Sequence, residues 1–234
     1  IEGLIKAVKE KRADIGIAFD GDADRCLAVD ENGVIVDGDK IIAIVSKAYK
    51  DEDKLKNNTV VVTVMTNLGF SFFAKENEIK VVTAQVGDRY VLEKMLDGGH
   101  NIGGEQSGHI IFLDESTTGD GQLSGMKLLE ILVKSGKKMS ELAAVMDHYP
   151  QVMINVKIST KAKETWKNDP EITGLISQRE KDLNAEGRIL VRESGTEPLI
   201  RVMLEGKNFE QINNYAIEIS EMIKQKVGID KEKM

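Results

Sequence analysis

The sequence predicts an α/β protein, with a mixed-sheet α/β domain followed by a small α+β domain. From residue 13 to about 148, short apolar, often β-branched runs alternate with helical stretches at the spacing of α/β folds. After Tyr149-Pro150 the pattern changes to one alternating strand, a charged helical stretch, two strands and a closing amphipathic helix. The change of pattern places a domain boundary near this dipeptide.

Composition narrows the class of protein. The 234 residues are 41% hydrophobic and 30% charged, which is enough for a core and one to two domains. A net charge of -7 argues against a nucleic-acid partner. No apolar run approaches the ~20 residues of a membrane span, so we expect no membrane partner. The single cysteine, Cys26, indicates a reducing compartment and a cytoplasmic protein, with the thiol used for packing.

The larger domain is expected to alternate strands and helices after a helix that ends near residue 10. Its β-branched runs predict strands, an Asn-Gly pair predicts a hairpin turn, and Asp39 and Asp88 are placed to cap helices. The expected order is strands 13–19, 26–30 and 34–36, helix 39–49, strand 59–65, helix 69–77, strand 80–83, a helix from 88, strand 108–113, and helices 121–134 and 140–148.

The smaller domain is expected to begin with a strand over 151–159, because apolar and polar residues alternate there. A charged helical stretch follows over about 161–184, interrupted at Pro170. Strands at 188–192 and 199–205 flank a polar loop, and a helix over 208–227 closes the domain. One face of that helix carries Ile212, Ala216, Ile219 and Ile223.

An acidic loop, Phe19–Arg25, organises the first part of the chain. Asp20, Asp22 and Asp24 alternate along it, directly after the apolar strand and before Arg25. Three carboxylates this close repel one another unless a cation lies among them, and oxygen ligands suit Mg²⁺, Mn²⁺ or Ca²⁺. Open α/β sheets also place ligand sites at the carboxyl ends of strands. The loop therefore predicts a metal site.

Two other interpretations of the acidic loop are possible. One is a solvated acidic turn without a ligand. The other is a calcium loop, because Glu31 lies at the distance of the last ligand of an EF-hand. An EF-hand needs glycine where this chain has Arg25, and a helix where this chain has a strand, so the second alternative is weak.

A glycine-rich loop, Gly103–His109, precedes the later strand of the larger domain. Glu105 can accept hydrogen bonds from hydroxyl groups or an amine of a sugar, and Ser107 adds a small donor and acceptor. The loop equally fits a plain glycine-rich connection. A lone histidine such as His109 is more often structural than catalytic.

A third polar loop, Arg192–Pro198, joins the two last strands of the smaller domain. Two hydroxyl groups, backbone N–H groups around Gly195 and two arginines, Arg192 and Arg201, suit a phosphate. The alternative is a hairpin loop with surface arginines. We favour the phosphate site.

Taken together, the three loops in this order and at these separations resemble the α-D-phosphohexomutase family, over essentially the whole chain. Gly104–His109 and Val86–Val91 resemble the branch of that family that acts on glucosamine phosphates. The resemblance implies that residues 1–34 end the family's second domain, 35–148 form its third and 150–234 its fourth.

The resemblance also implies a role for each loop. The acidic loop would hold Mg²⁺ through Asp20, Asp22 and Asp24, and Arg25 would act catalytically by facing the reacting phosphate. The other residues would bind the hexosamine phosphate substrate. Those at the sugar are Glu105 and Ser107, with His109 also in the substrate-binding set. Those at the non-reacting phosphate are Arg192, Ser194, Gly195, Thr196 and Arg201.

The family's nucleophile is absent from this sequence. Family members transfer phosphate through a phosphoserine in a Ser-His-Asn run, and none of the three histidines here follows a serine. We therefore expect the carboxy-terminal part of an enzyme that interconverts glucosamine 6-phosphate and glucosamine 1-phosphate through a bisphosphosugar. Its partners would be the missing amino-terminal domains, and the chain alone would be inactive. The alternatives are a mutase of glucose or mannose phosphates, and a binding fragment without turnover.

Overall fold

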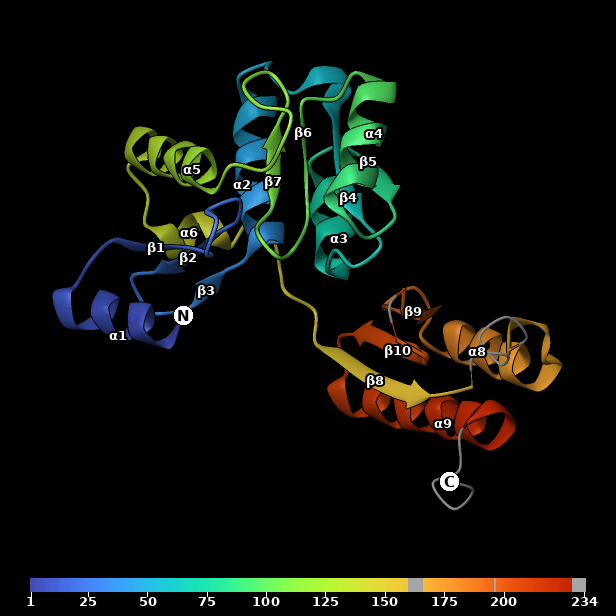
Figure 1. The fold of residues 1–234 in the computed structure, drawn as a ribbon. Helices are drawn as coiled ribbons and strands as arrows, with labels where there is room; N and C mark the ends of the chain where they lie inside the picture. Colours follow the sequence, from blue (N-terminus) through green and yellow to red (C-terminus); the bar gives the residue numbers. More distant parts are fainter. Residues whose placement is uncertain (160–165, 196, 229–234) are drawn as a thin grey trace. The chain divides into compact units, whose positions relative to one another are not determined.

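The polypeptide folds as an α/β unit over Ile1–His148 and a smaller α+β unit over Tyr149–Met234 (Figure 1). The computed structural model describes residues 1–159, 166–195 and 197–228. The predicted fold class, a mixed-sheet α/β domain with a small α+β domain after it, is confirmed. None of the helices in these three stretches is long and apolar enough to cross a membrane.

A four-stranded mixed sheet forms the centre of the larger unit. Its order is β5 (Lys80–Ala84), β4 (Thr59–Thr63), β6 (Ile102–Gly104) and β7 (Ile110–Phe112). The first three strands are parallel, and β7 pairs antiparallel with β6. The sequence analysis missed β6, because a single β-branched residue followed by two glycines carries no strand signal.

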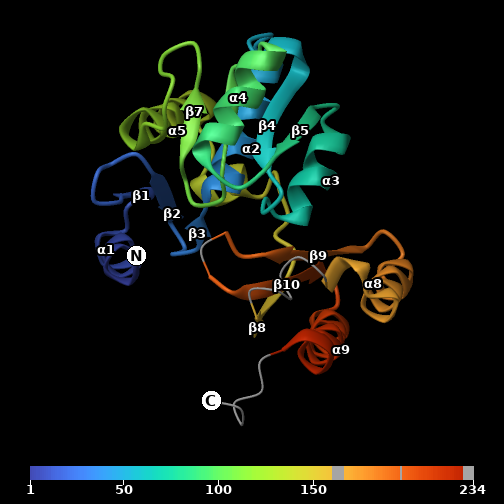
Figure 2. The same ribbon diagram turned by 45° about the vertical axis from the view of Figure 1, so that its right-hand side comes forward.

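Alternate residues of β4 contribute to two different core clusters. Val60 and Val62 pack in a cluster with residues of α2 (Gly38–Asp51) and α3 (Leu68–Glu76). Val61 joins the other cluster, with Val91 and Met95 of α4 (Asp88–Gly98). The helices around β4 and β5 can be followed in Figure 2. The strand is therefore buried on both faces, as its unbroken β-branched run predicts.

The first turn of α2 corrects one predicted cap. Asp37 is the N-cap, and its side chain accepts the Lys40 N–H at 3.1 Å. Asp39 is fully buried in the first turn, where its Oδ2 accepts the Asn67 N–H at 2.8 Å. The prediction was wrong because two aspartates two residues apart give the same capping signal, and only the tertiary contact with Asn67 separates them.

The predicted N-cap of α4 was also wrong. Gly87 is its N-cap, and Asp88 is its first residue. An aspartate at that position still suits the positive end of a helix.

A second, antiparallel sheet carries the acidic loop. It consists of β1 (Ile15–Phe19), β2 (Cys26–Asp30) and β3 (Ile35–Val36) in that order. Helices α1 (Glu2–Lys11) and α5 (Gly121–Ser135) both pack against it. Cys26, Ala28 and Val36 belong to the core cluster that contains α2, so this sheet shares a core with that part of the larger unit. The remaining short helices of this unit are η1 (Lys56–Asn58) and α6 (Met139–Ala143).

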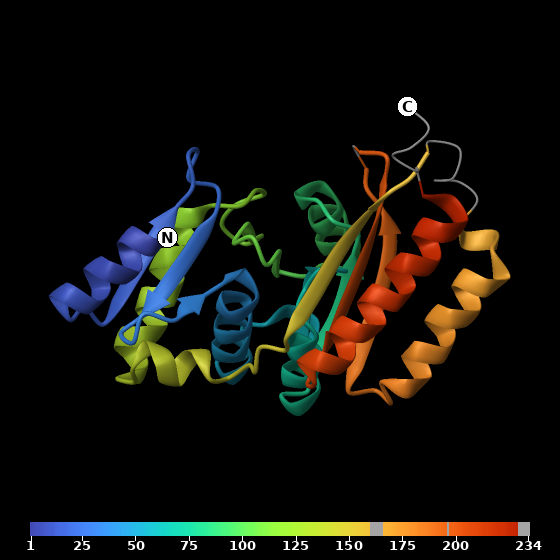
Figure 3. The same ribbon diagram turned by 90° about the horizontal axis from the view of Figure 1, so that it is seen from below.

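The smaller unit is a three-stranded antiparallel sheet with helices on one face (Figure 3). The strand order is β8 (Gln151–Lys157), β10 (Leu199–Gly206) and β9 (Gly187–Glu193). The helices are η2 (Trp166–Asn168), α8 (Pro170–Asp182) and α9 (Phe209–Val227). Ile200, Val202 and Leu204 of β10 pack in one core with the predicted apolar face of α9.

Pro170 does not interrupt a helix, as the sequence analysis expected. It lies in the first turn of α8, after the N-cap Asp169, whose side chain accepts the N–H groups of Glu171 and Ile172. The fixed φ and missing N–H of proline suit a first helical position. The expected helical residues 160–165 lie outside the described part of the chain.

The buried Cys26 gives the fold a testable pH dependence. Burial raises the pKa of this fully buried thiol from 9.0 to about 11. The thiol of the unfolded chain then ionises first, so the free energy of unfolding should fall as the pH rises from 9 to 11, by about 1.4 kcal/mol per unit. Chemical denaturation measures this fall. Cys26→Ala is the control, because it lacks the titrating group, and equal pH slopes in both proteins would contradict the assignment.

Candidate functional site

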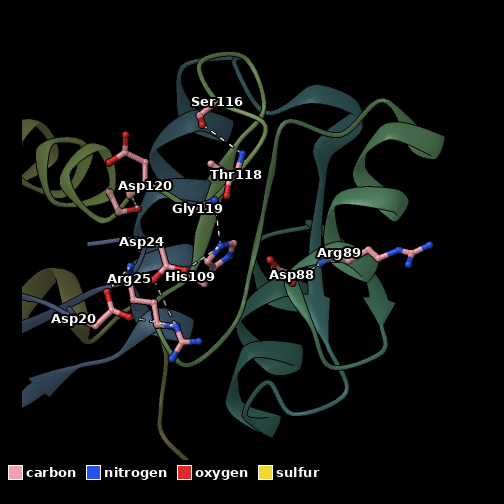
Figure 4. A network of polar contacts seen from close by, with 11 residues as sticks. Asp20, Asp24, Arg25, Asp88, Arg89, His109, Ser116, Thr118, Gly119 and Asp120 are labelled. Carbon is pink, nitrogen blue, oxygen red and sulfur yellow. Dashed lines mark hydrogen bonds and ion pairs between the residues drawn. The ribbon is translucent and has the colours of Figure 1, made fainter. Parts of the chain in front are cut away.

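The acidic loop after β1 brings its three carboxylates together. Oxygen atoms of Asp20, Asp22 and Asp24 all lie within 4.8 Å of one another. The loop turns at Ala23, which has a φ of 59°, and the Arg25 N–H closes it by donating to Asp20 Oδ1 at 3.2 Å. Figure 4 shows Asp20 and Asp24 with Arg25 between them. The local backbone therefore gathers the anionic groups that the sequence placed at alternate positions.

Electrostatics at this loop favour a bound cation. Burial raises the pKa of Asp24, and the neighbouring Asp20 and Asp22 raise it further, which records the cost of keeping three carboxylates charged. Arg25 offsets part of this cost, because its Nε lies 3.7 Å from Asp20 Oδ2 and 3.9 Å from Asp24 Oδ1.

One buried carboxylate oxygen of the acidic loop is left for a ligand. Within the described residues, buried Asp24 Oδ1 has no hydrogen-bond partner. An oxygen-only donor set with a buried oxygen of this kind fits a hard divalent cation such as Mg²⁺.

His109 lies beneath Asp24 and away from solvent. His109 is 4% exposed. Its Nε2 accepts the Gly119 N–H at 3.2 Å, and the same nitrogen lies 3.6 Å from Asp24 Oδ2. A Cβ atom at Gly119 would come within 2.4 Å of the imidazole, so glycine is needed there. The structure thus places His109 against the predicted metal ligand and the backbone of residue 119 (Figure 4).

Backbone contacts hold the acidic loop against the glycine-rich loop. The Cys26 N–H donates to Gly108 O at 3.0 Å, and Arg25 and His109 form an isolated β-bridge. Gly108 has a φ of +94°, and a Cβ atom there would lie 2.2 Å from Cys26 O. The acidic loop and the glycine-rich loop are therefore in direct backbone contact, although they are far apart in the sequence. Only glycine fits at position 108, where the two loops lie closest.

The glycine-rich loop presents two of the predicted sugar-binding residues. Ser107 is exposed at the turn between β6 and β7, and Glu105 is half-buried. Glu105 Oε1 accepts the Gly87 N–H at 3.0 Å, which ties the loop to the turn before α4. Gln106 Nε2 donates to Asp37 Oδ2 at 3.3 Å. The sequence analysis did not anticipate the contact between Glu105 and Gly87, because these residues are 18 positions apart in the sequence.

The phosphate loop lies in the smaller unit. Arg192 of β9 and Arg201 of β10 are register partners. The pKa of Arg192 is lowered by burial and then by the positive charge of Arg201. Arg201 Nη2 lies 3.8 Å from Glu197 Oε2, and its buried Nε has no hydrogen-bond partner among the described residues. Adjacent guanidinium groups of this kind repel, so a bound anion would stabilise them.

The turn between these strands is held by Ser194. Its N–H donates to Leu199 O at 2.9 Å and its Oγ accepts the Glu197 N–H at 3.3 Å, while the residue itself is 1% exposed. Gly195 is exposed, and Thr196 lies outside the described residues. Among the described residues of this loop, Gly195, Glu197 and Pro198 are exposed, whereas Ser194 is buried.

Comparison with known proteins identifies the family. The phosphoglucomutase/phosphomannomutase models match in order: the alpha/beta/alpha domain II over residues 1–33, the alpha/beta/alpha domain III over 37–149 and the C-terminal domain over 153–222. The chain belongs to the phosphoglucomutase/phosphomannomutase family. This confirms the resemblance that the three loops indicated.

Curated relatives in this family are phosphoglucosamine mutases. Those of Thermoanaerobacter sp. (strain X514) and Acetivibrio thermocellus are each 54% identical, over 227 and 228 residues, or 97% of this chain and 51% of each relative. The chain therefore spans about half the length of the curated relatives it matches.

Solved structures of phosphohexomutases share the fold. A family protein from Burkholderia thailandensis has a TM-score of 0.79 at 20% identity, covering 97% of this chain and 51% of its own. Aspergillus fumigatus N-acetylphosphoglucosamine mutase has a TM-score of 0.75 at 22% identity, covering 94% and 52%. Another structure of the Aspergillus enzyme, with a TM-score of 0.70 at 22% identity and the same coverage, is a complex with GlcNAc-6P and magnesium.

Proposed function

We propose that this chain is the metal-, sugar- and phosphate-binding half of a phosphoglucosamine mutase, which interconverts glucosamine 6-phosphate and glucosamine 1-phosphate. The observation that carries the proposal is 54% identity to curated phosphoglucosamine mutases over 97% of the chain. The convergent carboxylates of the acidic loop and the paired arginines of the phosphate loop support it. The proposed domains are residues 1–34, 35–148 and 150–234, in a soluble cytoplasmic enzyme.

The acidic loop would act on the phosphate that is transferred. Asp20, Asp22 and Asp24 would hold Mg²⁺, which stabilises the charge that spreads over a phosphoryl group during transfer. Arg25, whose side chain is 50% exposed, would face that phosphate. His109 would line the acidic loop on its buried side next to Asp24, and this position fits the predicted substrate-binding set.

Two other loops would bind the rest of the substrate. Glu105 and Ser107 would accept and donate hydrogen bonds at the sugar hydroxyls. The phosphate that is not being transferred would be bound in the smaller unit by Arg192, Ser194, Gly195, Thr196 and Arg201. Arginine suits this role because its planar fork bonds two phosphate oxygens at once.

The nucleophile would come from outside these residues. The three histidines follow Gly99, Gly108 and Asp147, so the family's Ser-His-Asn run is not in the chain. In the proposed reaction a phosphoserine gives its phosphoryl group to the free hydroxyl of the substrate, which yields a bisphosphosugar and a free serine. The bisphosphosugar then transfers its other phosphoryl group to the serine, which regenerates the phosphoserine, and the sugar monophosphate that remains leaves as product.

Substrate kinetics test this proposal. We define the completed enzyme as this chain preceded by the amino-terminal half of the Thermoanaerobacter relative, with that relative as positive control. Phosphorus NMR follows conversion of glucosamine 6-phosphate, glucose 6-phosphate and mannose 6-phosphate. The highest kcat/KM is expected for glucosamine 6-phosphate. A preference for glucose or mannose phosphate, or no turnover where the control is active, would overturn the assignment.

The phosphate loop can be tested in the chain itself. Inorganic phosphate should shift the amide NMR signals around Gly195, and Arg192→Ala should weaken the binding roughly tenfold or more, because a charge-assisted hydrogen bond contributes about 1.5–3 kcal/mol. Arg12→Ala is the control, since it removes the same charge from the other unit. Shifts centred on Gly103–His109, or a phosphate affinity that Arg192→Ala leaves unchanged, would show that the loop is only a hairpin turn.

A further inference from the structure

The Gly-Asp-Gly segment, residues 119–121, leads into α5 and lies against the acidic loop. The Gly121 N–H donates to Ala23 O at 2.9 Å, and Gly121 is buried. Ala23 stands between Asp22 and Asp24 in the sequence. The segment therefore bonds directly to the backbone that joins two of the proposed metal ligands.

Position 121 has no room for a side chain. A Cβ atom there would lie 2.4 Å from Arg25 O and 2.9 Å from Ala23 O. Both oxygen atoms belong to the backbone of the acidic loop, so no side-chain rotation can relieve the clash. A larger residue at this position would have to move the acidic loop or the start of α5.

The Gly-Asp-Gly segment is itself anchored at both ends. Asp120 is the N-cap of α5, and its side chain accepts the Leu123 N–H at 2.9 Å. The Gly119 N–H donates to His109 Nε2 at 3.2 Å (Figure 4). Helix α5 packs against β1 and β2, the two strands that the acidic loop connects. The hydrogen bond from Gly121 to the acidic loop therefore starts from a fixed support.

Ala23 has a backbone conformation that needs such support. Its φ of 59° is in the left-handed region, which residues with a side chain rarely adopt and which persists only where surrounding contacts maintain it. Resting on the proposed function, we infer that Gly121 is a positioning residue for the cation site. Its N–H fixes the Ala23 carbonyl and so keeps the carboxylates of Asp22 and Asp24 converged.

This role has two measurable consequences. Carboxylates that are already converged bind a cation more tightly, because less order has to be created on binding. The coupling is also reciprocal, so bound Mg²⁺ should stabilise the bond between Gly121 and Ala23 by the same factor. One typical hydrogen bond corresponds to about tenfold in an equilibrium constant.

Two glycine substitutions in the completed enzyme separate positioning from packing. Gly121→Ala should bind Mg²⁺ about tenfold more weakly in a calorimetric titration. Gly125→Ala is the matched control and should bind Mg²⁺ within about twofold of the unsubstituted enzyme. Gly125 is also buried in α5, but a Cβ atom there would lie 3.4 Å from the methyl groups of Ile17, an ordinary van der Waals distance.

The dependence of activity on Mg²⁺ distinguishes positioning from a general structural defect. Saturating Mg²⁺ should restore kcat of Gly121→Ala to within about threefold of the unsubstituted enzyme, because all three carboxylates remain. Equal Mg²⁺ affinities of Gly121→Ala and the unsubstituted enzyme, or a loss of kcat that saturating Mg²⁺ does not restore, would overturn the role of Gly121 while the cation site stands.

Hydrogen exchange measures the reciprocal effect without any substitution. In the unsubstituted completed enzyme, Mg²⁺ should slow exchange of the Gly121 amide about tenfold and leave the amides of β10 in the smaller unit unchanged. Exchange at Gly121 that Mg²⁺ does not alter would overturn the role of this residue. A completed enzyme that does not bind Mg²⁺ at all would instead overturn the proposed cation site, and the inference with it.

Discussion

Replacing Asp22 by asparagine in the completed enzyme should lower kcat by about 10²–10³-fold, the effect of removing one group that stabilises transition-state charge. Asp22 is exposed, so its loss should not unfold the protein. The substitution removes one of three carboxylates within 4.8 Å of one another and should weaken the proposed cation site. Calorimetric titration of Mg²⁺ into the completed enzyme should accordingly show lower affinity in the variant.

The control for this experiment is Asp14→Asn. Asp14 is also exposed, and it lies just before β1 rather than in the loop that follows the strand. It removes the same charge from the same part of the chain. The contrary result would be an Asp22→Asn enzyme with unchanged Mg²⁺ affinity and with activity within about twofold of the unsubstituted enzyme. That result would mean that the acidic loop is a solvated turn.

Replacing Arg188 by methionine should destabilise the smaller unit by about 3 kcal/mol. Arg188 of β9 pairs with Glu205 of β10, with Nε and Oε2 2.5 Å apart, and the side chain of Glu205 is only 1% exposed. Methionine keeps most of the apolar stem but removes the guanidinium group that pairs with the buried Glu205 carboxylate. Chemical denaturation of the chain, followed by the fluorescence of Trp166 in that unit, measures the loss.

Lys207→Met is the matched control in the same unit. Lys207 and Glu186 form an exposed ion pair, with 3.5 Å between the charged atoms, and such pairs contribute about 0–1 kcal/mol. The double variant Arg188→Met with Glu205→Leu should recover much of the lost stability, because no buried charge remains. Equal, small effects of Arg188→Met and Lys207→Met would show that Glu205 does not depend on Arg188.

Much of the fold was predictable because its signals are local. The β-branched run of β4, the Asn-Gly turn before β3 and the apolar face of α9 each specify an element through neighbouring residues. The errors arose where distant residues decide. Strand β6 forms because β4 and β7 pair with its glycines, and the Asp37 cap differs from Asp39 only through the contact with Asn67.

In the candidate site, too, local features were predictable and contacts between distant residues were not. Residue types alone indicated the acidic, glycine-rich and phosphate loops. Clustered carboxylates suit a cation, glycines allow tight turns, and arginines suit a phosphate. The sequence did not show that His109 is buried against Asp24, or that Glu105 binds the turn at Gly87. Both contacts join residues 18 or more positions apart, so no local pattern contains them.

The most direct measurement locates the phosphoryl group on the protein. The completed enzyme is incubated with glucose 1,6-bisphosphate and digested, and mass spectrometry maps the modified residue. We expect phosphate on a serine of the amino-terminal half, because this chain contains no Ser-His-Asn run. Phosphate on a residue of this chain, such as Ser107 or Ser194, would contradict the proposed division between a half that binds and a half that carries the nucleophile.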